Sequence, residues 1–386
     1  MSHDVSALFD WLVDGAPGAQ TPVDVLERMC PELVERGVPL ARVAAFVRTL
    51  HPHIMGRSFL WRTGGNVVVK EASHAILSSP EFMKSPVARV FETGAEFRRR
   101  LDTLESTEHE LLQGLAREKM TDYFALPMRF LSGQIHAITF ATDHASGFSD
   151  ADLATLRHVV RPLTRVGEIF ALSRTAVNLL NTYVGHDAGE RILAGKILRG
   201  DTDVIRCVIW FSDLRGFTRM ADQVPPATLI RNLNELFDYQ VPAIERHAGE
   251  VLKFMGDGML AIFPVGGRQV AEVAREALAA AREAFESLAR GNAGRAERGE
   301  PELYFGLALH VGDVTYGNIG GANRLDFTCI GPAVNLAARI EALTSKLGER
   351  LLLSAELAEH VTDPLQEKGE HELKGVRDRQ RVFALG

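Results

Sequence analysis

The sequence predicts an α+β protein with two domains. Its 386 residues are 46% apolar and 24% charged, a globular composition that is long enough for two separate cores. Stretches with the apolar spacing of amphipathic helices alternate along the chain with short runs rich in β-branched residues. One pair of such runs, 251–255 and 259–263, is joined by Gly256, Asp257 and Gly258 and is typical of a β-hairpin. These observations indicate helices that flank sheets.

The composition also disfavours several classes of protein. A net charge of −7 without a basic stripe disfavours nucleic acid as a partner, and the run Arg98 to Arg100 is interpreted as a solvated face. The 3 cysteines lie in apolar stretches, which predicts reduced core residues in a cytoplasmic protein. Asp4 and Asp10 interrupt the start of the chain, so no signal peptide is expected. The sequence contains no apolar window long enough to span a membrane, so no membrane partner is expected.

The first 170 residues are predicted to form one α+β domain. Helical spacing is present at 6–13, 21–36, 86–93, 108–121 and from Ala151 onward. Strand patterns are present at 40–50, 57–62, 67–70, 123–130 and 135–142. Thr21 with Pro22, and Ser149 with Asp152, are signals for helix starts.

This order of helix, strands, hairpin and long final helix resembles a GAF-type sensor domain over about residues 20–170. A PAS-like or an unrelated α+β module is the alternative. The resemblance implies that residues 1–170 are a regulatory domain with a small-molecule effector as partner.

Two groups of side chains in this domain are candidates for ligand binding. The histidines are candidate metal or haem ligands, although scattered histidines are more often structural: His51, His53, His136 and His144. The aromatic residues are candidates for a pocket wall, although core packing is the more common use: Phe46, Phe59 and Trp61.

A helical linker is predicted at 171–200, with a break at Gly185. Its apolar positions Val177, Leu180 and Val184 follow the three-four spacing of a parallel two-helix seam, which predicts a homodimer. Further on, an Ala-rich helix is expected at 271–290, followed by a flexible polar loop at 291–301.

The strongest chemical signal lies between Val204 and Phe263. A strand at 205–211 delivers Asp213 to the point where the chain leaves the sheet, and the hairpin turn presents Asp257. An Asp-Gly turn alone is usually only a hairpin. Two carboxylates at the ends of adjacent strands, however, are suited to Mg²⁺, which takes one or two protein carboxylates and leaves positions for phosphates. The hypothesis is a two-metal site for phosphoryl transfer.

A third segment, 324–341, favours the metal site over a simple hairpin turn. A strand ends at Gly331 and a helix follows, and the segment supplies Thr328, Asn335 and Arg339. Asn335 and Arg339 are four residues apart and share one helix face, which is unusual beside apolar neighbours unless an anion binds there.

Together, FSDLRGFT (211–218), EVLKFMGDGMLAIF (250–263) and RLDFTCIGPAVNLAARIE (324–341) resemble the catalytic domain of class III nucleotidyl cyclases over residues 201–386. The resemblance implies a ferredoxin-like fold and a homodimer with two Mg²⁺ or Mn²⁺ per site. It implies metal binding by Asp213, Asp257 and the carbonyl of Leu214, and substrate binding by Lys253, Thr328, Lys374 and Phe217. It implies catalytic roles for Asn335 and Arg339. A separate hypothesis is that Asp213 also acts as a proton acceptor.

The base reader indicates the substrate. Lys253 can donate to adenine N1 and Thr328 can accept from its amino group, whereas a guanine reader needs an acceptor at the first position. Cys329 points to the other strand face. ATP, cyclized to 3′,5′-cyclic AMP, is therefore favoured, with guanylate cyclase or a non-catalytic nucleotide-binding module as alternatives. In this family one subunit supplies the metal aspartates and the other supplies the nucleotide-binding residues.

Overall fold

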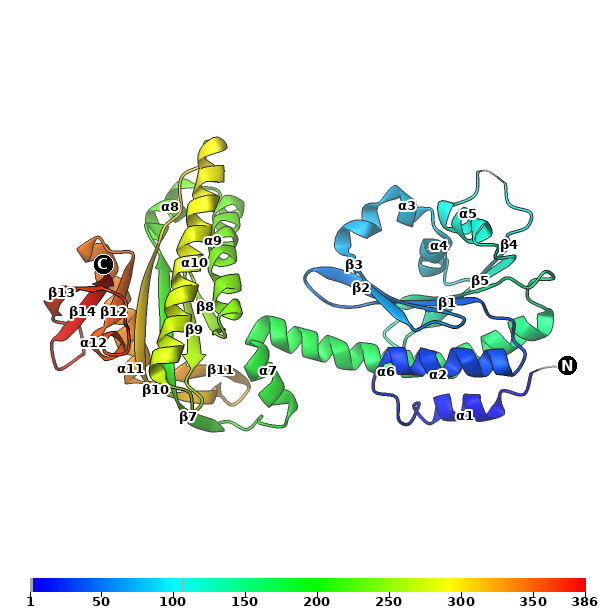
Figure 1. Ribbon diagram of the computed structural model, residues 1–386, viewed down its shortest axis with the longest axis horizontal. Coiled ribbons are helices and arrows are strands. Elements are labelled where there is room, and N and C mark those ends of the chain that lie inside the picture. Colours follow the sequence, from blue (N-terminus) through cyan, green and yellow to red (C-terminus); the bar gives the residue numbers. More distant parts are fainter. Residues whose placement is uncertain (1–2, 106) are drawn as a thin grey trace. The chain divides into compact units, whose positions relative to one another are not determined.

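The computed structural model describes residues 3–105 and 107–386, which form two compact units, Met1–Leu179 and Leu180–Gly386 (Figure 1). Both units combine helices with sheets, so the predicted α+β class is confirmed. Across the described residues, no helix combines the length and the apolar character needed to span a membrane.

The N-terminal unit is built on a six-stranded antiparallel sheet with the order β3-β2-β1-β6-β5-β4. Its strands are β1 Arg42–Arg48, β2 Ile54–Arg62, β3 Val68–Ser73, β4 Phe97–Arg100, β5 Asp122–Arg129 and β6 Ile135–Thr142. One sheet face carries α1 Ser6–Val13, α2 Pro22–Glu35 and the first part of α6 Asp150–Val184 (Figure 1). The other face carries η1 His74–Ser78, α3 Pro80–Met83, α4 Pro86–Thr93 and α5 Glu110–Arg117.

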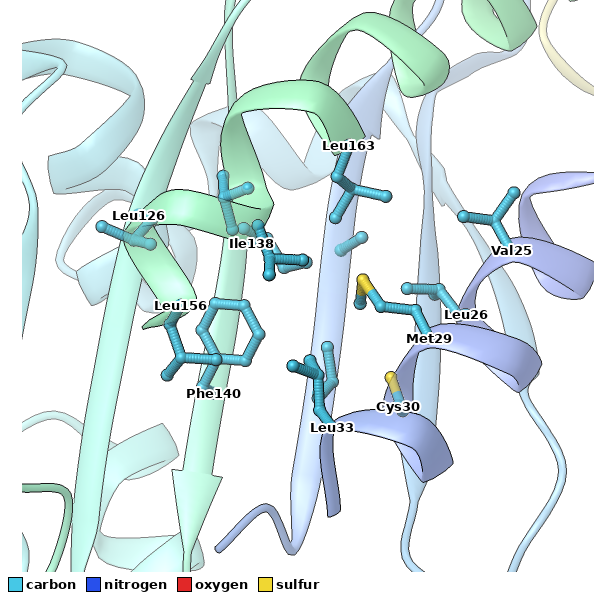
Figure 2. Packing of buried hydrophobic residues seen from close by; sticks show 14 of the residues in the cluster. Val25, Leu26, Met29, Cys30, Leu33, Leu126, Ile138, Phe140, Leu156 and Leu163 are labelled. Carbon is cyan, nitrogen blue, oxygen red and sulfur yellow. The ribbon is translucent and has the colours of Figure 1, made fainter. Parts of the chain in front are cut away.

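The larger core of this unit lies between the sheet, α2 and α6. Figure 2 shows Leu26 and Met29 of α2 facing Ile138 and Phe140 of β6, with Leu163 of α6 beside them. All five side chains are buried, because the period of the helix and the alternation of the strand both turn apolar residues into this layer.

The predicted helix starts are confirmed. Thr21 accepts a hydrogen bond from the backbone of Asp24, and the Asp24 carboxylate accepts one from the backbone of Thr21, which completes a capping box. Ser149 and Asp152 form the same reciprocal pair at the start of α6. These signals are local, so the sequence alone was enough to find them.

The run Arg98–Arg100 is in contact with solvent, as the interpretation as a solvated face expects, since its side chains are 31–35% exposed, but it also has a structural role. These residues form the edge strand β4, and Arg98 makes an ion pair of 2.7 Å with Asp122, whose side chain is fully buried. A buried carboxylate needs such a partner, because removing a charge from water is otherwise costly. The partner lies 24 residues away in sequence, which is why the pattern of the run did not reveal it.

The C-terminal unit contains an eight-stranded sheet, in which β10-β7-β9-β8 is the central order. Its strands are β7 Thr202–Leu214, β8 Glu250–Met255, β9 Gly258–Pro264, β10 Phe305–Gly321, β11 Arg324–Ile330, β12 Leu351–Ser354, β13 Leu365–His371 and β14 Gln380–Leu385. Its helices are α7 His186–Leu193, α8 Phe217–Gln223, α9 Pro226–Arg246, α10 Val270–Glu297, α11 Pro332–Leu347 and α12 Ala355–Ala358.

The central strands follow the predicted ferredoxin-like plan. Helix α9 connects β7 to β8, and α10 connects β9 to β10, which gives the order β-α-β-β-α-β. Trp210 and Phe263 lie in the buried cluster that α9 and α10 cover. The side chains of Ile209 and Ala337 belong to a second cluster, on the face where α11 packs.

The predicted flexible loop at 291–301 is wrong, because α10 continues to Glu297. Asn292 is buried and exchanges two hydrogen bonds with the backbone of Leu303. Arg295 is almost fully buried and forms an ion pair of 2.5 Å with Glu235. These long-range contacts stabilise two more helical turns that the local polar composition did not predict.

The exposed apolar face of α6 differs from the predicted seam. Val177, Leu180 and Val184 are half-buried, and Val184 packs against the second cluster of the C-terminal unit. A different set, defined here as the α6 stripe, is exposed at three-four spacing: Ile169 (62%), Leu172 (60%), Ala176, Leu179 (39%) and Tyr183 (81%).

Candidate active site

Asp213 and Asp257 lie at the same end of two adjacent strands. Asp213 is the penultimate residue of β7 and pairs with Gly258, which directly follows Asp257. A Cβ at Gly258 would lie 3.3 Å from Oδ1 of Asp213, so the glycine leaves room for this carboxylate. The hairpin turn and the end of β7 therefore bring the two predicted metal-binding aspartates together.

The surroundings of Asp213 raise the pKa of its carboxyl group. Burial, and then the negative charge of Asp257, raise the pKa of Asp213 to about 6. Two acidic groups that repel each other form a site suited to a cation. With the backbone carbonyl of Leu214 next to Asp213, all candidate donors are oxygens, which is the donor set that Mg²⁺ takes.

The predicted base readers share a different part of the unit. Lys253 on β8 and Thr328 on β11 both line an open cavity of about 1340 Å³, whose lining does not include Asp213 or Asp257. Tyr316 of β10 and Phe254 of β8 supply an aromatic part of the wall. The cavity is large enough to admit a flat heterocycle beside Lys253.

Asp326 is a polar partner that the sequence reasoning missed. Its carboxylate forms an ion pair of 2.5 Å with the ammonium of Lys253, and this hydrogen bond lowers the pKa of Asp326. Asp326 precedes Thr328 by two residues on β11, so both side chains point to one face of the strand. The alternation of side chains along this predicted strand was therefore the sequence signal that could have placed Asp326 beside Thr328.

Helix α11 presents Asn335 and Arg339 on an exposed face, as their spacing predicts. The opposite face of α11 lies close to β10 at two glycines. A Cβ at Gly312 would lie 2.6 Å from the Cβ of Ala333, and one at Gly306 would lie 2.3 Å from the hydroxyl of Thr344. At Gly312 a Cβ would meet an atom that cannot rotate away, so only glycine permits this approach without displacing α11, whereas at Gly306 side-chain atoms of α11 would have to move.

Glu341 is a second residue that the sequence reasoning missed. It lies on α11, two residues after Arg339, and its Oε1 would be 2.4 Å from a Cβ at Gly306. Gly306 pairs with Asp213 across β10 and β7. Burial, and then the charge of Asp213, raise the pKa of Glu341 to about 7. A lone acid among apolar residues of a helix was the signal that could have identified it.

The two remaining predicted substrate-binding residues, Lys374 and Phe217, do not line the cavity that contains Lys253 and Thr328. Lys374 is exposed in the segment between β13 and β14. Phe217 is the first residue of α8 and packs against the core cluster beneath α9 and α10, so the described contacts give it a packing role.

The site residues form separate groups within one chain. In the range 3–105 and 107–386, no hydrogen bond or ion pair joins Asp213 or Asp257 to Lys253, Thr328 or Arg339. Asp213 and Phe211 nevertheless point to the sheet face on which α11 packs, because alternate residues of β7 share a face.

Helix α7, which precedes β7, contacts the wall of the cavity that Lys253 and Thr328 line. The hydroxyl of Tyr316 lies within hydrogen-bond distance of the carboxylates of Asp187 on α7 (3.1 Å) and Glu250 on β8 (3.2 Å), and its single proton can be donated to either one. A Cβ at Gly185, where φ is 100°, would lie 3.1 Å from Oε1 of Glu250. The break between α6 and α7 therefore seats α7 against the strand that carries Lys253.

The candidate histidines of the N-terminal unit show structural contacts. His136 is fully buried, accepts a hydrogen bond of 3.0 Å from the backbone of Arg48 and lies against the ring of Phe130. His51 lies beside His53. Among the described residues, no three or more His, Cys, Asp or Glu side chains gather closely enough to hold a metal ion.

Comparison with known proteins gives a family match for the C-terminal unit. Residues 202–386 match the family described as Adenylate and Guanylate cyclase catalytic domain. An adenylate cyclase of Anabaena cylindrica is 29% identical over 213 residues, which cover 52% of this chain and 42% of that protein. Adenylate cyclase 1 of Rhizobium meliloti (strain 1021) is 25% identical over 272 residues, which cover 68% of this chain and 40% of that protein.

Among solved structures, the guanylyl cyclase Cya2 is 29% identical with a TM-score of 0.43, and the match covers 48% of this chain and 93% of that one. The chain spans less than half the length of the two curated relatives.

Proposed function

We propose that this chain, whose residues 202–386 match the family described as Adenylate and Guanylate cyclase catalytic domain, is an adenylate cyclase that converts ATP to 3′,5′-cyclic AMP and pyrophosphate. The observation that carries the proposal is the proximity of Asp213, near the end of β7, to Asp257, in the turn directly before β9. The choice of ATP rests on Lys253, a donor in the cavity where a guanine reader needs an acceptor. The names of the two bacterial relatives also support it.

In the proposed reaction, a bond forms between the 3′-oxygen and the α-phosphorus while the bond from that phosphorus to the leaving pyrophosphate breaks. Lys253 donates to adenine N1 and Thr328 accepts from the exocyclic amino group. Asn335 orients the ribose, and Arg339 stabilises the charge that develops on the phosphate oxygens. Lys374 holds the terminal phosphates, and Asp213 accepts the proton of the 3′-hydroxyl.

Asp213, Asp257 and the carbonyl of Leu214 fit a pair of Mg²⁺ or Mn²⁺ ions by their donor chemistry. When bound, such ions supply Lewis acidity towards the 3′-hydroxyl and the phosphate oxygens. The protein's own contribution is positioning, because α11 is held against β10 at Gly306 and Gly312.

We propose that the active form is a homodimer. Exposed apolar side chains around the cavity support a partner surface on the C-terminal unit, notably Phe254 (50%), Ile330 (50%) and Val204 (76%). The α6 stripe supports a second contact along the stalk, because exposed apolar residues at three-four spacing pair with a matching helix. In such a dimer, the aspartates of one subunit and the base readers of the other form each site.

Regulation by the N-terminal unit is the third part of the proposal. The contacts of α7 with Tyr316 and Glu250 support it, since they connect the end of α6 to β8, which bears Lys253. A signal would act by favouring one of two arrangements of the stalk.

Turnover tests the proposal directly. Purified full-length chain with ATP and Mg²⁺ or Mn²⁺ should form cyclic AMP, and GTP should be the poorer substrate. Asp257→Asn should abolish turnover, whereas Asp238→Asn, on the exposed side of α9, should not. Formation of cyclic GMP in preference to cyclic AMP, or no product with either metal, would contradict the proposal.

Mixing two inactive variants tests the composite site. Asp257→Asn and Arg339→Ala should each be inactive alone, because each damages both sites of its own dimer. After exchange of subunits, about half of the dimers are mixed and each has one complete site, so about a quarter of wild-type activity should return. A mixture that stays inactive although the subunits exchange would exclude the shared site.

A further inference from the structure

A second cavity, of about 600 Å³, lies wholly within the N-terminal unit, between α2, α6 and one face of the sheet. Its size is within the range of small-molecule sites in proteins. Two rows of paired residues across β1, β2 and β3 form its sheet wall. They differ in character, and this difference indicates the ligand.

The inner row is apolar. Ala45, Phe59 and Val69 pair across the three strands, and Met128 and Leu163 also line this part of the cavity. These side chains offer no donor or acceptor to the sugar of a nucleotide. The lining contains no histidine or cysteine, so it also lacks the usual ligands of haem or zinc.

The outer row is polar and carries surplus positive charge. Val47, Arg57 and Glu71 pair across the same strands, and Arg57 forms an ion pair of 2.6 Å with Glu71. Arg174 of α6 also lines the cavity, and no ion pair or hydrogen bond to it exists among the described residues. The hydroxyl of Thr49 is buried there and has no hydrogen-bond partner in the part of the chain that the structure describes.

Because Arg57 is neutralised by Glu71, the polar end of the cavity has one unpaired guanidinium among the described residues, that of Arg174. The guanidinium of Arg48 does not add to it, because it lies over the ring of Phe91, 5.4 Å from its centroid, and Phe91 packs with the cluster on the opposite sheet face. A guanidinium binds a carboxylate through two parallel hydrogen bonds, and a buried hydroxyl can donate a third.

We propose that this cavity binds a small organic monocarboxylate with an apolar body. The apolar body lies between Phe59, Met128 and Leu163, and the carboxylate lies between Arg174 and Thr49. The proposal concerns a site in the N-terminal unit and does not depend on the cyclase activity proposed above.

Calorimetric titration of the full-length chain with decanoate, and with decanol as the uncharged analogue, tests this site. Decanoate should bind more tightly than decanol, because only the acid pairs with the guanidinium. Arg174→Gln should weaken decanoate binding by about tenfold or more and leave decanol unchanged, since a hydrogen bond to a charged group is lost. Arg161→Gln, an exposed arginine of the same helix that lies outside the cavity lining, should change neither.

A variant whose larger side chain fills the cavity provides a second, independent test of the site. Ala171 lines the cavity from α6, and Ala171→Phe should reduce binding of both molecules while circular dichroism shows an intact fold. Equal binding of decanoate and decanol, equal losses in the two arginine variants, or unchanged binding in folded Ala171→Phe would each overturn the proposal. Competition by cyclic AMP but not by other carboxylates would overturn it in favour of a nucleotide site.

Discussion

Reversing the charge of Lys253 separates base recognition from folding. The side chains of Lys253 and Asp326 are 43% and 44% exposed, so loss of their ion pair should lower the free energy of unfolding by at most about 1 kcal/mol. Lys253→Glu also removes the proposed hydrogen bond to adenine, and a hydrogen bond with a charged partner contributes about 1.5–3 kcal/mol. At about 1.36 kcal/mol per factor of ten, kcat/KM for ATP should fall by about 10- to 160-fold.

Initial rates of cyclic AMP and cyclic GMP formation, measured with the same metal ion, give this ratio. Lys196→Glu is a matched control, because Lys196 is also an exposed lysine in an ion pair, 3.0 Å from Asp203. Its kcat/KM should stay unchanged, and both variants should unfold near the wild-type temperature. An unchanged kcat/KM for ATP in Lys253→Glu, or an equal fall in Lys196→Glu, would refute the base-reading role.

Three further predictions concern stability. Burial lowers the pKa of His136 from 6.5 to about 4, so the unfolded chain takes up this proton first and the free energy of unfolding should fall as the pH drops from 6.5 to 4. Urea unfolding at successive pH values should show a slope of up to about 1.4 kcal/mol per pH unit, which His136→Gln should remove. Gly306→Ala should cost about 1–3 kcal/mol in thermal unfolding and lower kcat, because the methyl group would force the side chains of Thr344 and Glu341 to move. Arg295→Ala leaves the Glu235 carboxylate without its buried partner and should cost about 3–5 kcal/mol in urea unfolding, whereas exposed Arg298→Ala should cost less than about 1.

The features that the sequence predicted well depend on neighbouring residues. The capping box of Thr21 and Asp24, the hairpin around Asp257 and the helix start at Pro332 each involve a few consecutive positions. Asp213 was placed correctly because a strand that ends in an acid before a glycine is also a local pattern.

The features that were missed depend on contacts between distant segments. Arg98 is fixed by the buried Asp122, and the end of α10 is fixed by Arg295 against Glu235, 60 residues away. The Lys253 to Asp326 pair joins residues 73 positions apart. No local pattern contains such partners, although strand alternation already placed Asp326 beside Thr328.

The seam of α6 was misjudged for a related reason. Two three-four series run along this helix, and spacing alone does not tell which one faces the chain itself. The fold turns Val177 towards the cavity of the N-terminal unit, so the exposed series is the one that contains Leu172 and Leu179.

Helix α6 thus has two different surroundings: one side lines the N-terminal cavity, and the other side carries the exposed α6 stripe. Phe170 and Arg174 line the N-terminal cavity, whereas Leu172, two residues after Phe170, is exposed on the α6 stripe. Because both sets of side chains lie on one helix, a ligand that displaced the cavity-facing side of α6 would also displace the α6 stripe. In the proposed dimer, binding of a ligand in the N-terminal cavity would then change the angle between the two α6 helices. No hinge within the N-terminal unit would be needed.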